Sequence, residues 1–399
     1  MASVPEEFDN RSDDEVAEFL ARWQAAGGPT PEPAVPADAG DEPARLGVPA
    51  LAVRHFSRSV DVAWRRTSYS SLTAVEAAPT PLARGVASEP EMEAKDDEEV
   101  GALDAAVPTE RATVERTVIS PMAGLPVGAT FGSLVHAVLE HADPDAADLH
   151  AELLGHIDEQ LVRWPVELDR VELADALVAV CDSPLGGLAG TTLRGVPLRD
   201  RLREMEFELP LAGGDLVGAP GAGPDVRLGD LAPLLRRHLP EGDPVRSFAD
   251  ALDAPALGGQ SLRGYLTGSV DVVLRLPGPR SLVVDTKTNW LGVADQPLAA
   301  HDYRPEALAA AMGHSDYPLQ ALLYAVVLHR FLRWRQPRYD PATHLGGVLY
   351  LYLRGMCGPE TPLVDGEPCG VFAWQPPVAL VEELSDLLDG AGRLEGSAR

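Results

Sequence analysis

The chain has 399 residues, enough for two or three domains, and its hydrophobic fraction of 45% is ordinary for a globular protein. It has no run of 18 apolar residues that would predict a membrane span, and its acidic, polar start MASVPEEFDN is unlike a secretory signal, so we expect a cytoplasmic location. The formal net charge of −28 argues against non-specific affinity for nucleic acid unless basic residues are concentrated locally.

The first predicted element is a short amphipathic helix within residues 10–26, followed by a Gly-Gly pair that ends it. Four apolar side chains recur there at helical spacing: Val16, Phe19, Leu20 and Trp23. Residues 29–48 are rich in Pro, Ala and Asp and are expected to form a linker.

Residues 49–75 are predicted to form a strand and a turn that lead into the main domain. Arg65 and Arg66 in this segment either contact DNA phosphates or belong to an ordinary surface. Residues 76–116 contain few aromatic residues, and positions 89 to 110 hold nine acids against one lysine. This composition predicts a disordered acidic linker.

Residues 128–141 predict a helix that carries His136. A single histidine on a helix is more often a packed or surface residue than a metal ligand, so the residues alone leave both interpretations open. Further helices are expected within residues 146–190.

Residues 203–211 alternate between polar and apolar side chains and predict a strand, on which Glu204 and Glu206 share one face. That face is either directed at a site or simply solvated. Residues 212–262 are rich in Gly, Pro and Asp and are expected to form an insertion or covering loop with one helix at 229–238.

The most informative stretch is GSVDVVLRLPGPRSLVVDTKTNW, residues 268–290, which predicts two strands joined by a Pro-Gly-Pro turn. Asp271 interrupts the first apolar run. Asp285 and Lys287 follow the second run on one face, because side chains at i and i+2 of a strand point the same way. A turn centred on Gly278 places Asp271 opposite Asp285.

Two carboxylates that face each other on a sheet repel, and burying them is costly unless a cation lies between them. Carboxylate oxygens suit Mg²⁺ or Mn²⁺, and Lys287 adds a positive charge beside such an ion. Because no Ser-His or Cys-His pair accompanies them, these residues indicate metal-assisted attack of water on a phosphodiester. The competing interpretation is a surface hairpin with scattered charges.

Residues 317–334 predict a long helix on which Gln320 and Tyr324 lie one turn apart, either serving the site or packing in the core. Three arginines near its end are candidate contacts to a DNA backbone, or a solvated surface: Arg330, Arg333 and Arg335. Residues 345–355 predict a central strand buried on both faces, and residues 377–389 predict a closing helix before a loose tail.

Several strings in the region from about residue 51 to 356 resemble the PD-(D/E)xK nuclease superfamily, and more specifically the nuclease domain of the RecB family, the beta subunits of exodeoxyribonuclease V (RecBCD). They are the string from Trp64 to Leu72, Gly132-x-x-x-His136, Asp285-Thr-Lys-Thr-Asn-Trp-Leu-Gly292, Gln320-x-x-x-Tyr324 and the GGV-x-Y-x-x-x-RG string that ends at Gly355. Thr286 stands where that family usually has Tyr, a difference that leaves the charges intact.

The resemblance implies an α/β fold with a central mixed sheet flanked by helices. It implies a Mg²⁺ site (Mn²⁺ is an alternative) in which His136 and Glu204 complete the shell of Asp271 and Asp285. It assigns catalytic roles to Lys287, Gln320 and Tyr324. No iron–sulfur cluster is expected, because the chain has three cysteines without cluster spacing.

By this resemblance the chain is a metal-dependent deoxyribonuclease of double-strand-break repair and recombination. It is expected to act on linear DNA ends and single strands with RecC-like and RecD-like or other helicase subunits. Residues 117–390 would form the nuclease domain, and residues 1–48 a remnant of a helicase tail with its linker. The chain has no GxxxxGK[ST] phosphate loop, so we expect no ATP site. The alternatives are a non-catalytic module that guides DNA or assembles partners, and a detached piece of a split beta subunit.

Overall fold

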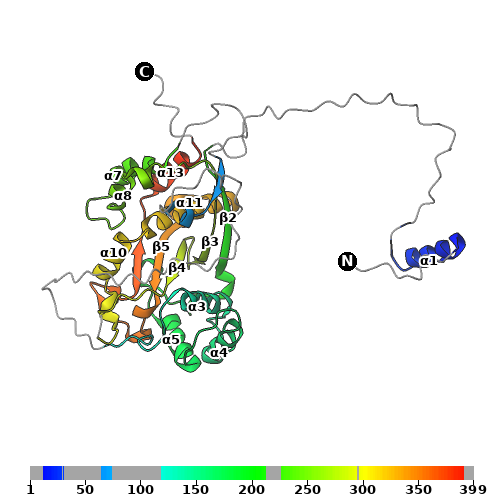
Figure 1. Cartoon of the computed structure of the whole chain (residues 1–399), viewed down its shortest axis with the longest axis horizontal. Helices are drawn as coiled ribbons and strands as arrows, with labels where there is room; N and C mark the ends of the chain where they lie inside the picture. The colour runs from blue at the N-terminus through cyan, green and yellow to red at the C-terminus, as the bar shows by residue number, and fades with distance from the viewer. Residues whose placement is uncertain are drawn as a thin grey trace, which may run out of the picture. The chain divides into compact units, whose positions relative to one another are not determined.

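A computed structural model describes residues 12–28, 30, 64–73, 118–212, 226–293 and 296–390 (Figure 1). The chain divides into two compact units, residues 1–58 and 59–399. In the first unit the described element is α1 (Asp13–Ala25), which confirms the predicted helix. Ser12 and Glu15 form a capping box at its start, with the Ser12 backbone nitrogen 2.9 Å from a Glu15 carboxylate oxygen. The predicted acidic linker at 76–116 lies outside the described residues.

The second unit is built on a mixed six-stranded sheet, as expected. Its strands are β1 (Arg65–Thr67), β2 (Arg201–Pro210), β3 (Gly264–Arg275), β4 (Ser281–Lys287), β5 (Leu345–Tyr352) and β8 (Val371–Trp374). The order is β1-β3-β4-β5-β8, with β2 paired to β3. β1 runs parallel to β3 and β4 parallel to β5, whereas the other pairs are antiparallel. A separate small hairpin joins β6 (Leu363–Val364) and β7 (Glu367–Pro368).

Helices cover both faces of this sheet, which gives three layers (Figure 1). One face packs on α3 (Ala129–His141), α4 (Leu149–Gln160) and α5 (Arg170–Asp182). The other face packs on α7 (Ala232–His238), α8 (Phe248–Leu252), α10 (Pro305–Gly313), α11 (Tyr317–Arg335) and α13 (Val378–Leu388). Shorter helical segments are α2 (Tyr69–Thr73), α6 (Gly186–Ala189), α9 (Pro255–Gly258) and α12 (Pro341–His344). No helix in the described part of the chain is long and apolar enough to cross a membrane.

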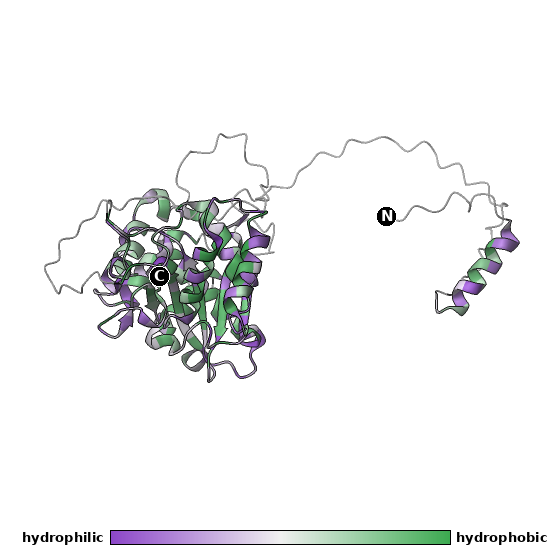
Figure 2. Cartoon of the chain, turned by 90° about the horizontal axis from the view of Figure 1, so that it is seen from below, coloured by the Kyte–Doolittle hydropathy of each residue, from purple (hydrophilic) through white to green (hydrophobic). Residues whose placement is uncertain are grey.

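The central strand β5 explains why two separate hydrophobic cores form. Its side chains alternate, so that Leu349 and Leu351 join the core under α3 to α5 while Tyr350 and Tyr352 join the core under α11. All eight residues of β5 are buried, as the continuous apolar run predicts. Figure 2 shows the hydrophobic residues gathered in the sheet and on the inner sides of the helices.

The β3–β4 hairpin has the predicted register. Val272 lies opposite Val284 and Leu274 opposite Leu282, which is the alignment that places Asp271 across from Asp285. Gly278 lies in the turn with a φ of 101°, a conformation that favours glycine.

The two strands separate beyond Val284, and this opens a gap in the sheet. β2 pairs with β3 along almost its whole length, so β1 and β4 must share the opposite edge of β3. On that edge β1 pairs with residues 264–266 and β4 with residues 272–275, whereas residues 285–287 of β4 pair only with β5. Residues 267–271 of β3 therefore face a gap between two strand ends, as far as the described residues show.

A fully buried arginine fixes the ends of the segments around this gap. Arg354 follows β5, and its guanidinium donates to the carbonyl oxygen of Thr288 at 2.7 Å and to that of Met122 at 2.9 Å. It also donates to the carbonyl of Pro126 and lies 5.0 Å from the centre of the Phe131 ring. Arg354 thus links the chain just after β4 to the segment that leads into α3.

Candidate active site

The gap in the sheet holds a cavity of about 160 Å³. Its walls come from the β1–α2 corner, α3, the open part of β3, the end of β4 and the start of α11. The lining residues are Ser68, Tyr69, Ser70, Gly132, Ser133, His136, Phe207, Thr267, Gly268, Ser269, Asp271, Asp285, Lys287, Gln320 and Tyr324. Most of the predicted catalytic and metal-binding side chains therefore meet in one place.

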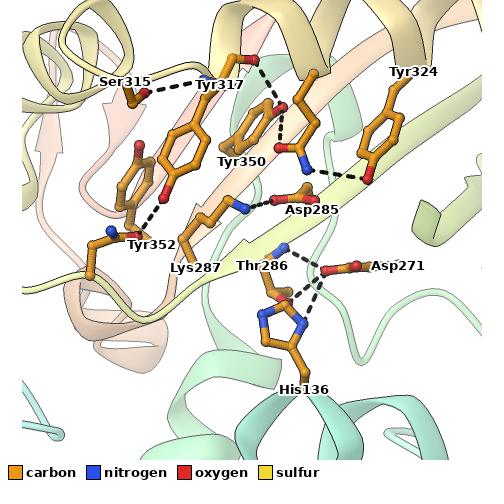
Figure 3. A network of polar contacts seen from close by, with 12 residues as sticks. His136, Asp271, Asp285, Thr286, Lys287, Ser315, Tyr317, Tyr324, Tyr350 and Tyr352 are labelled. Carbon is orange, nitrogen blue, oxygen red and sulfur yellow. Dashed lines mark hydrogen bonds and ion pairs between the residues drawn. The ribbon is translucent and has the colours of Figure 1, made fainter. Parts of the chain in front are cut away.

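The carboxylate of Asp285 is paired with the ammonium of Lys287, as Figure 3 shows. The Lys287 Nζ lies 3.0 Å from Asp285 Oδ2, and both side chains are at most 6% exposed. Asp271, also buried, accepts a 3.0 Å hydrogen bond from the backbone nitrogen of Thr286. That nitrogen belongs to the part of β4 that has left β3, so the Asp271 carboxylate takes the place of a missing strand partner.

His136 reaches the same carboxylate from α3 (Figure 3). Its Nδ1 lies 3.2 Å from Asp271 Oδ2 and 2.9 Å from the Thr286 hydroxyl oxygen. The Thr286 hydroxyl also donates to Asp271 at 3.0 Å, which leaves its oxygen able to accept from the imidazole. Thr286, the position that departs from the RecB pattern, thus orients both His136 and Asp271.

Glu204 lies beside the cavity but is not among the residues that line it. Arg203 is opposite Val272 and Met205 opposite Val270, so Glu204 stands at the position of β2 that corresponds to Asp271 on β3. Its φ of 41° is unusual for a residue with a side chain, and its carboxylate accepts a hydrogen bond from Ser269. Glu206, the other acid that was expected on the same face of this strand, is exposed.

Gln320 and Tyr324 hold the open part of β3 in place. Tyr350 donates to the Gln320 side-chain oxygen at 2.9 Å, and the Gln320 amide donates to the Tyr324 hydroxyl at 3.2 Å. The Tyr324 hydroxyl donates in turn to the carbonyl of Ser269 at 2.7 Å, a carbonyl that faces the gap. Burial, reinforced by the negative charges of Asp285 and Asp271, raises the pKa of Tyr324 well above its ordinary value, so the hydroxyl stays a neutral donor.

The predicted DNA-binding arginines differ in whether their guanidinium groups make contacts inside the protein or lie exposed on its surface. Arg330 is used inside the protein: its guanidinium lies 2.8 Å from an Asp389 carboxylate oxygen, 2.9 Å from the Ser385 hydroxyl and 3.0 Å from the Pro210 carbonyl. These contacts join α11 to α13 and the end of β2. The Arg330 guanidinium thus has a structural role inside the protein, and its contact with DNA stays a prediction.

Arg333 and Arg335 are exposed at the end of α11. Arg65 contacts the Gln260 side chain at 3.1 Å, and burial lowers its pKa. Arg66 pairs with Glu208 at 2.8 Å on the surface. None of these four arginines lines the cavity.

Sequence reasoning missed the wall formed by Ser68, Tyr69 and Ser70. These residues follow the short strand β1, and Leu72, which is fully buried, anchors the α2 turn that carries them. In the sequence, this string stands out only as part of a family pattern. Its place in the site depends on the pairing of β1 with β3, about 200 residues later, which no local signal predicts.

The residues at the cavity suit a divalent metal ion. Asp271 and Asp285 are buried carboxylates on the neighbouring strands β3 and β4, and His136 supplies an imidazole next to Asp271. Among the residues that the structure describes, no three His, Cys, Asp or Glu side chains already form a metal-binding cluster. The fit therefore rests on the two carboxylates and the adjoining imidazole, with Glu204 one strand away.

Comparisons with known proteins agree with this geometry. The family model described as "PD-(D/E)XK nuclease superfamily" matches residues 119–369. The chain belongs to the PD-(D/E)XK nuclease superfamily. Nucleases of this superfamily generally use divalent metal ions, and the matched range contains every residue named above as a candidate metal ligand.

The chain is also similar to proteins named RecBCD enzyme subunit RecB. It is 55% identical to that of Mycolicibacterium smegmatis over 95% of this chain and 34% of the relative. It is 53% identical to that of Mycobacterium tuberculosis H37Rv over 99% of this chain and 35% of the relative. For Escherichia coli K12 the identity is 31% over 69% of this chain and 20% of the relative. The chain thus spans about a third of the length of the mycobacterial relatives.

Proposed function

We propose that this chain is a Mg²⁺-dependent deoxyribonuclease that hydrolyses DNA phosphodiesters in double-strand-break repair and recombination. The observation that carries the proposal is the cavity at the sheet gap, where Asp271, Asp285, Lys287 and His136 converge. We place the nuclease domain at residues 117–390, with residues 49–75 as its entry segment, because that segment contributes β1 to the sheet and residues 68–70 to the cavity wall. We assign residues 1–48 to a helicase-tail remnant with its linker.

Asp271, Asp285 and His136 would hold the metal ion, with Glu204 on the neighbouring strand β2 as a further candidate ligand. A divalent cation bound there supplies a Lewis acid for the phosphoryl oxygen and makes water a stronger nucleophile. The protein's own part is to fix the carboxylates: the Thr286 backbone and hydroxyl hold Asp271, and Lys287 holds Asp285. Both carboxylates are thereby fixed before substrate arrives.

Lys287 orients the attacking water or stabilises the negative charge that develops on the phosphate. This role is supported by the presence of a lysine at position 287 in a chain whose other basic residues are almost all arginines. The chain has 33 lysines and arginines together, and only Lys95 and Lys287 are lysines. A compact ammonium on a flexible stem suits a small buried site, whereas the planar guanidinium does not.

Neutral groups would position the DNA at the cavity. The cavity lining offers the hydroxyls of Ser68, Ser70 and Ser133, which can donate to phosphate oxygens. Lys287 is the only lysine or arginine among the described residues that line the cavity. Arg333 lies about 20 Å along the helix from Gln320, at 1.5 Å per residue, so it can reach the DNA backbone only away from the cleavage point.

By similarity to the RecB proteins, we propose that the chain works with RecC-like and RecD-like or other helicase subunits on linear DNA ends and single strands. The second candidate is a module that only guides DNA or assembles partners. Such a module has no need for two buried carboxylates and a buried lysine around one cavity, and the presence of all three favours catalysis.

The test is degradation of linear single-stranded and duplex DNA by the full chain, with Mg²⁺ or EDTA and with or without helicase partners. Asp285→Ala is the inactivating variant, and Glu206→Gln, an exposed acid on the neighbouring strand, is its matched control. We expect metal-dependent cleavage that Asp285→Ala abolishes and Glu206→Gln keeps. Cleavage only with partners would mean a detached catalytic piece. DNA binding without cleavage under any condition would refute the nuclease and favour the guiding module.

A further inference from the structure

We propose that Tyr317 is a positioning residue for Lys287: its aromatic ring holds the lysine ammonium beside Asp285, facing the cavity. This inference rests on the proposed nuclease function, because it concerns how the catalytic lysine is placed. Tyr317 is not among the residues that line the cavity, so it would act through Lys287 rather than on the DNA.

The Lys287 ammonium lies between one carboxylate and an aromatic face (Figure 3). Its Nζ is 4.4 Å from the centre of the Tyr317 ring and 5.9 Å from that of Tyr350. The two rings are stacked, with centres 5.7 Å apart and planes inclined by 24°. A cation held over the face of a ring is attracted by the ring's quadrupole, most strongly where water is excluded.

The Tyr317 ring is itself held on several sides. It stands at the first residue of α11, and its backbone nitrogen donates to the Ser315 hydroxyl at 3.3 Å. Its own hydroxyl donates to the Asn289 side chain at 3.3 Å, and its carbonyl accepts from Tyr350 at 3.2 Å. Asn289 lies two residues after Lys287, so the start of α11 is fastened directly to the end of β4.

This arrangement answers a problem that lysine creates. Its side chain is a flexible stem of four carbons, and its compact ammonium can donate hydrogen bonds in several directions. An ion pair with a carboxylate fixes the distance between the two charged groups, but the ammonium can still take many positions around the carboxylate. The Tyr317 ring limits that swing, so Lys287 keeps one orientation relative to Asp285 and Asp271.

The small number of lysines makes a direct test possible. Protein labelled with ¹³C at lysine Cε gives two signals, one from Lys95 and one from Lys287, and Lys287→Arg identifies the second. Protons beside an aromatic face resonate upfield of their ordinary position. We expect an upfield Lys287 signal in the wild type and in Tyr317→Phe, and its return to the ordinary position in Tyr317→Met, which fills similar volume without a ring.

Kinetics give the second readout. We expect kcat to fall at least about tenfold in Tyr317→Met with KM within about twofold, and Tyr317→Phe to restore most of kcat. Fluorinated phenylalanines at position 317 keep the packing while weakening the ring quadrupole, so kcat should fall stepwise with fluorination even where Tyr317→Met folds poorly. Tyr339→Leu removes a ring that lies edge-on to His329 instead of facing Lys287, so it is the control and should change neither readout.

An unshifted Lys287 signal in the wild type, or a shifted signal that survives in Tyr317→Met, would overturn the proposal. So would an equal loss of kcat in Tyr317→Phe and Tyr317→Met, because the hydroxyl contact with Asn289 would then be what matters. If the wild-type chain cleaves no DNA, the proposed function fails, whereas the lysine signal still decides the placement of Lys287 by Tyr317.

Discussion

The Asp285–Lys287 pair is expected to dominate the stability of the site, and a double-mutant cycle measures this. The pair is buried, with 3.0 Å between Nζ and Oδ2. Removing one partner of a buried ion pair costs about 3–5 kcal/mol, because the other charge stays buried without compensation. In Asp285→Asn the attraction between the Tyr317 ring and the ammonium remains, and it offsets about 1–2 kcal/mol of this cost. For Asp285→Asn we therefore expect a loss of about 2–3 kcal/mol in the free energy of unfolding.

Lys287→Met should cost at least as much, because it leaves Asp285 beside Asp271 without a cation. The double variant Asp285→Asn/Lys287→Met removes both charges and should cost only about 1–2 kcal/mol, so the two single losses should exceed the double loss by about 2 kcal/mol or more. The assay is urea unfolding in EDTA, where a difference of this size changes the folding equilibrium constant more than tenfold.

The same assay with Mg²⁺ links stability to the metal site. An ion that binds the folded state alone should add about 2.7 kcal/mol to the wild type at a hundred times its Kd, and much less to Asp285→Asn. Single variants within about 0.5 kcal/mol of the wild type, or strict additivity in the cycle, would refute the reasoning that these charges are buried and mutually dependent.

Three further expectations concern other parts of the domain. Ser70→Ala should weaken DNA binding about threefold to tenfold, which is the effect of losing one hydrogen bond. Ser71→Ala, on the same helix but outside the cavity lining, should leave DNA binding unchanged. Equal DNA binding by the two variants would exclude a role for the Ser70 hydroxyl in holding DNA. Arg330→Met should lower the free energy of unfolding by about 2–3 kcal/mol without changing the salt dependence of DNA binding. Arg333→Ala should leave the free energy of unfolding unchanged. It should reduce by about one the slope of the logarithm of the DNA-binding constant against the logarithm of the salt concentration. Burial, helped by the charges of Arg333 and Arg330, lowers the pKa of His329 from 6.5 to about 4. The unfolded chain then binds the proton first, so stability should fall as pH drops from about 6.5 to about 4, by at most about 1.4 kcal/mol per pH unit. His329→Gln should flatten that part of the pH profile, and an unchanged profile would contradict the assignment.

The hairpin shows which parts of the site could be predicted from sequence. A Pro-Gly-Pro turn and alternating side chains are local signals, and together they gave the correct alignment of Val272 with Val284. The gap in the sheet beside this hairpin, which forms the cavity, could not be predicted from local sequence signals. It arises because β4 turns away to pair with β5 and because β1 arrives from a distant part of the chain.

The helix α11 shows a second limit. Every residue from Tyr317 to His329 is buried, so the amphipathic pattern that normally separates an inner from an outer face is absent. Arg330 and Arg333 are therefore alike in sequence, but one lies against α13 and the other is exposed. Only the packing of α13 and the end of β2 distinguishes them.

The position of Arg354 has a consequence for the order in which the enzyme matures during translation. Its carbonyl partner at Met122 is made 232 residues earlier, and the hairpin that carries the acids is also complete before it. A ribosome therefore releases His136 and both aspartates well before the arginine that fastens their supports together. A nascent or prematurely terminated chain should hold the catalytic groups loosely. We expect the chain to become able to cut DNA only once β5 and the arginine that follows it have been made.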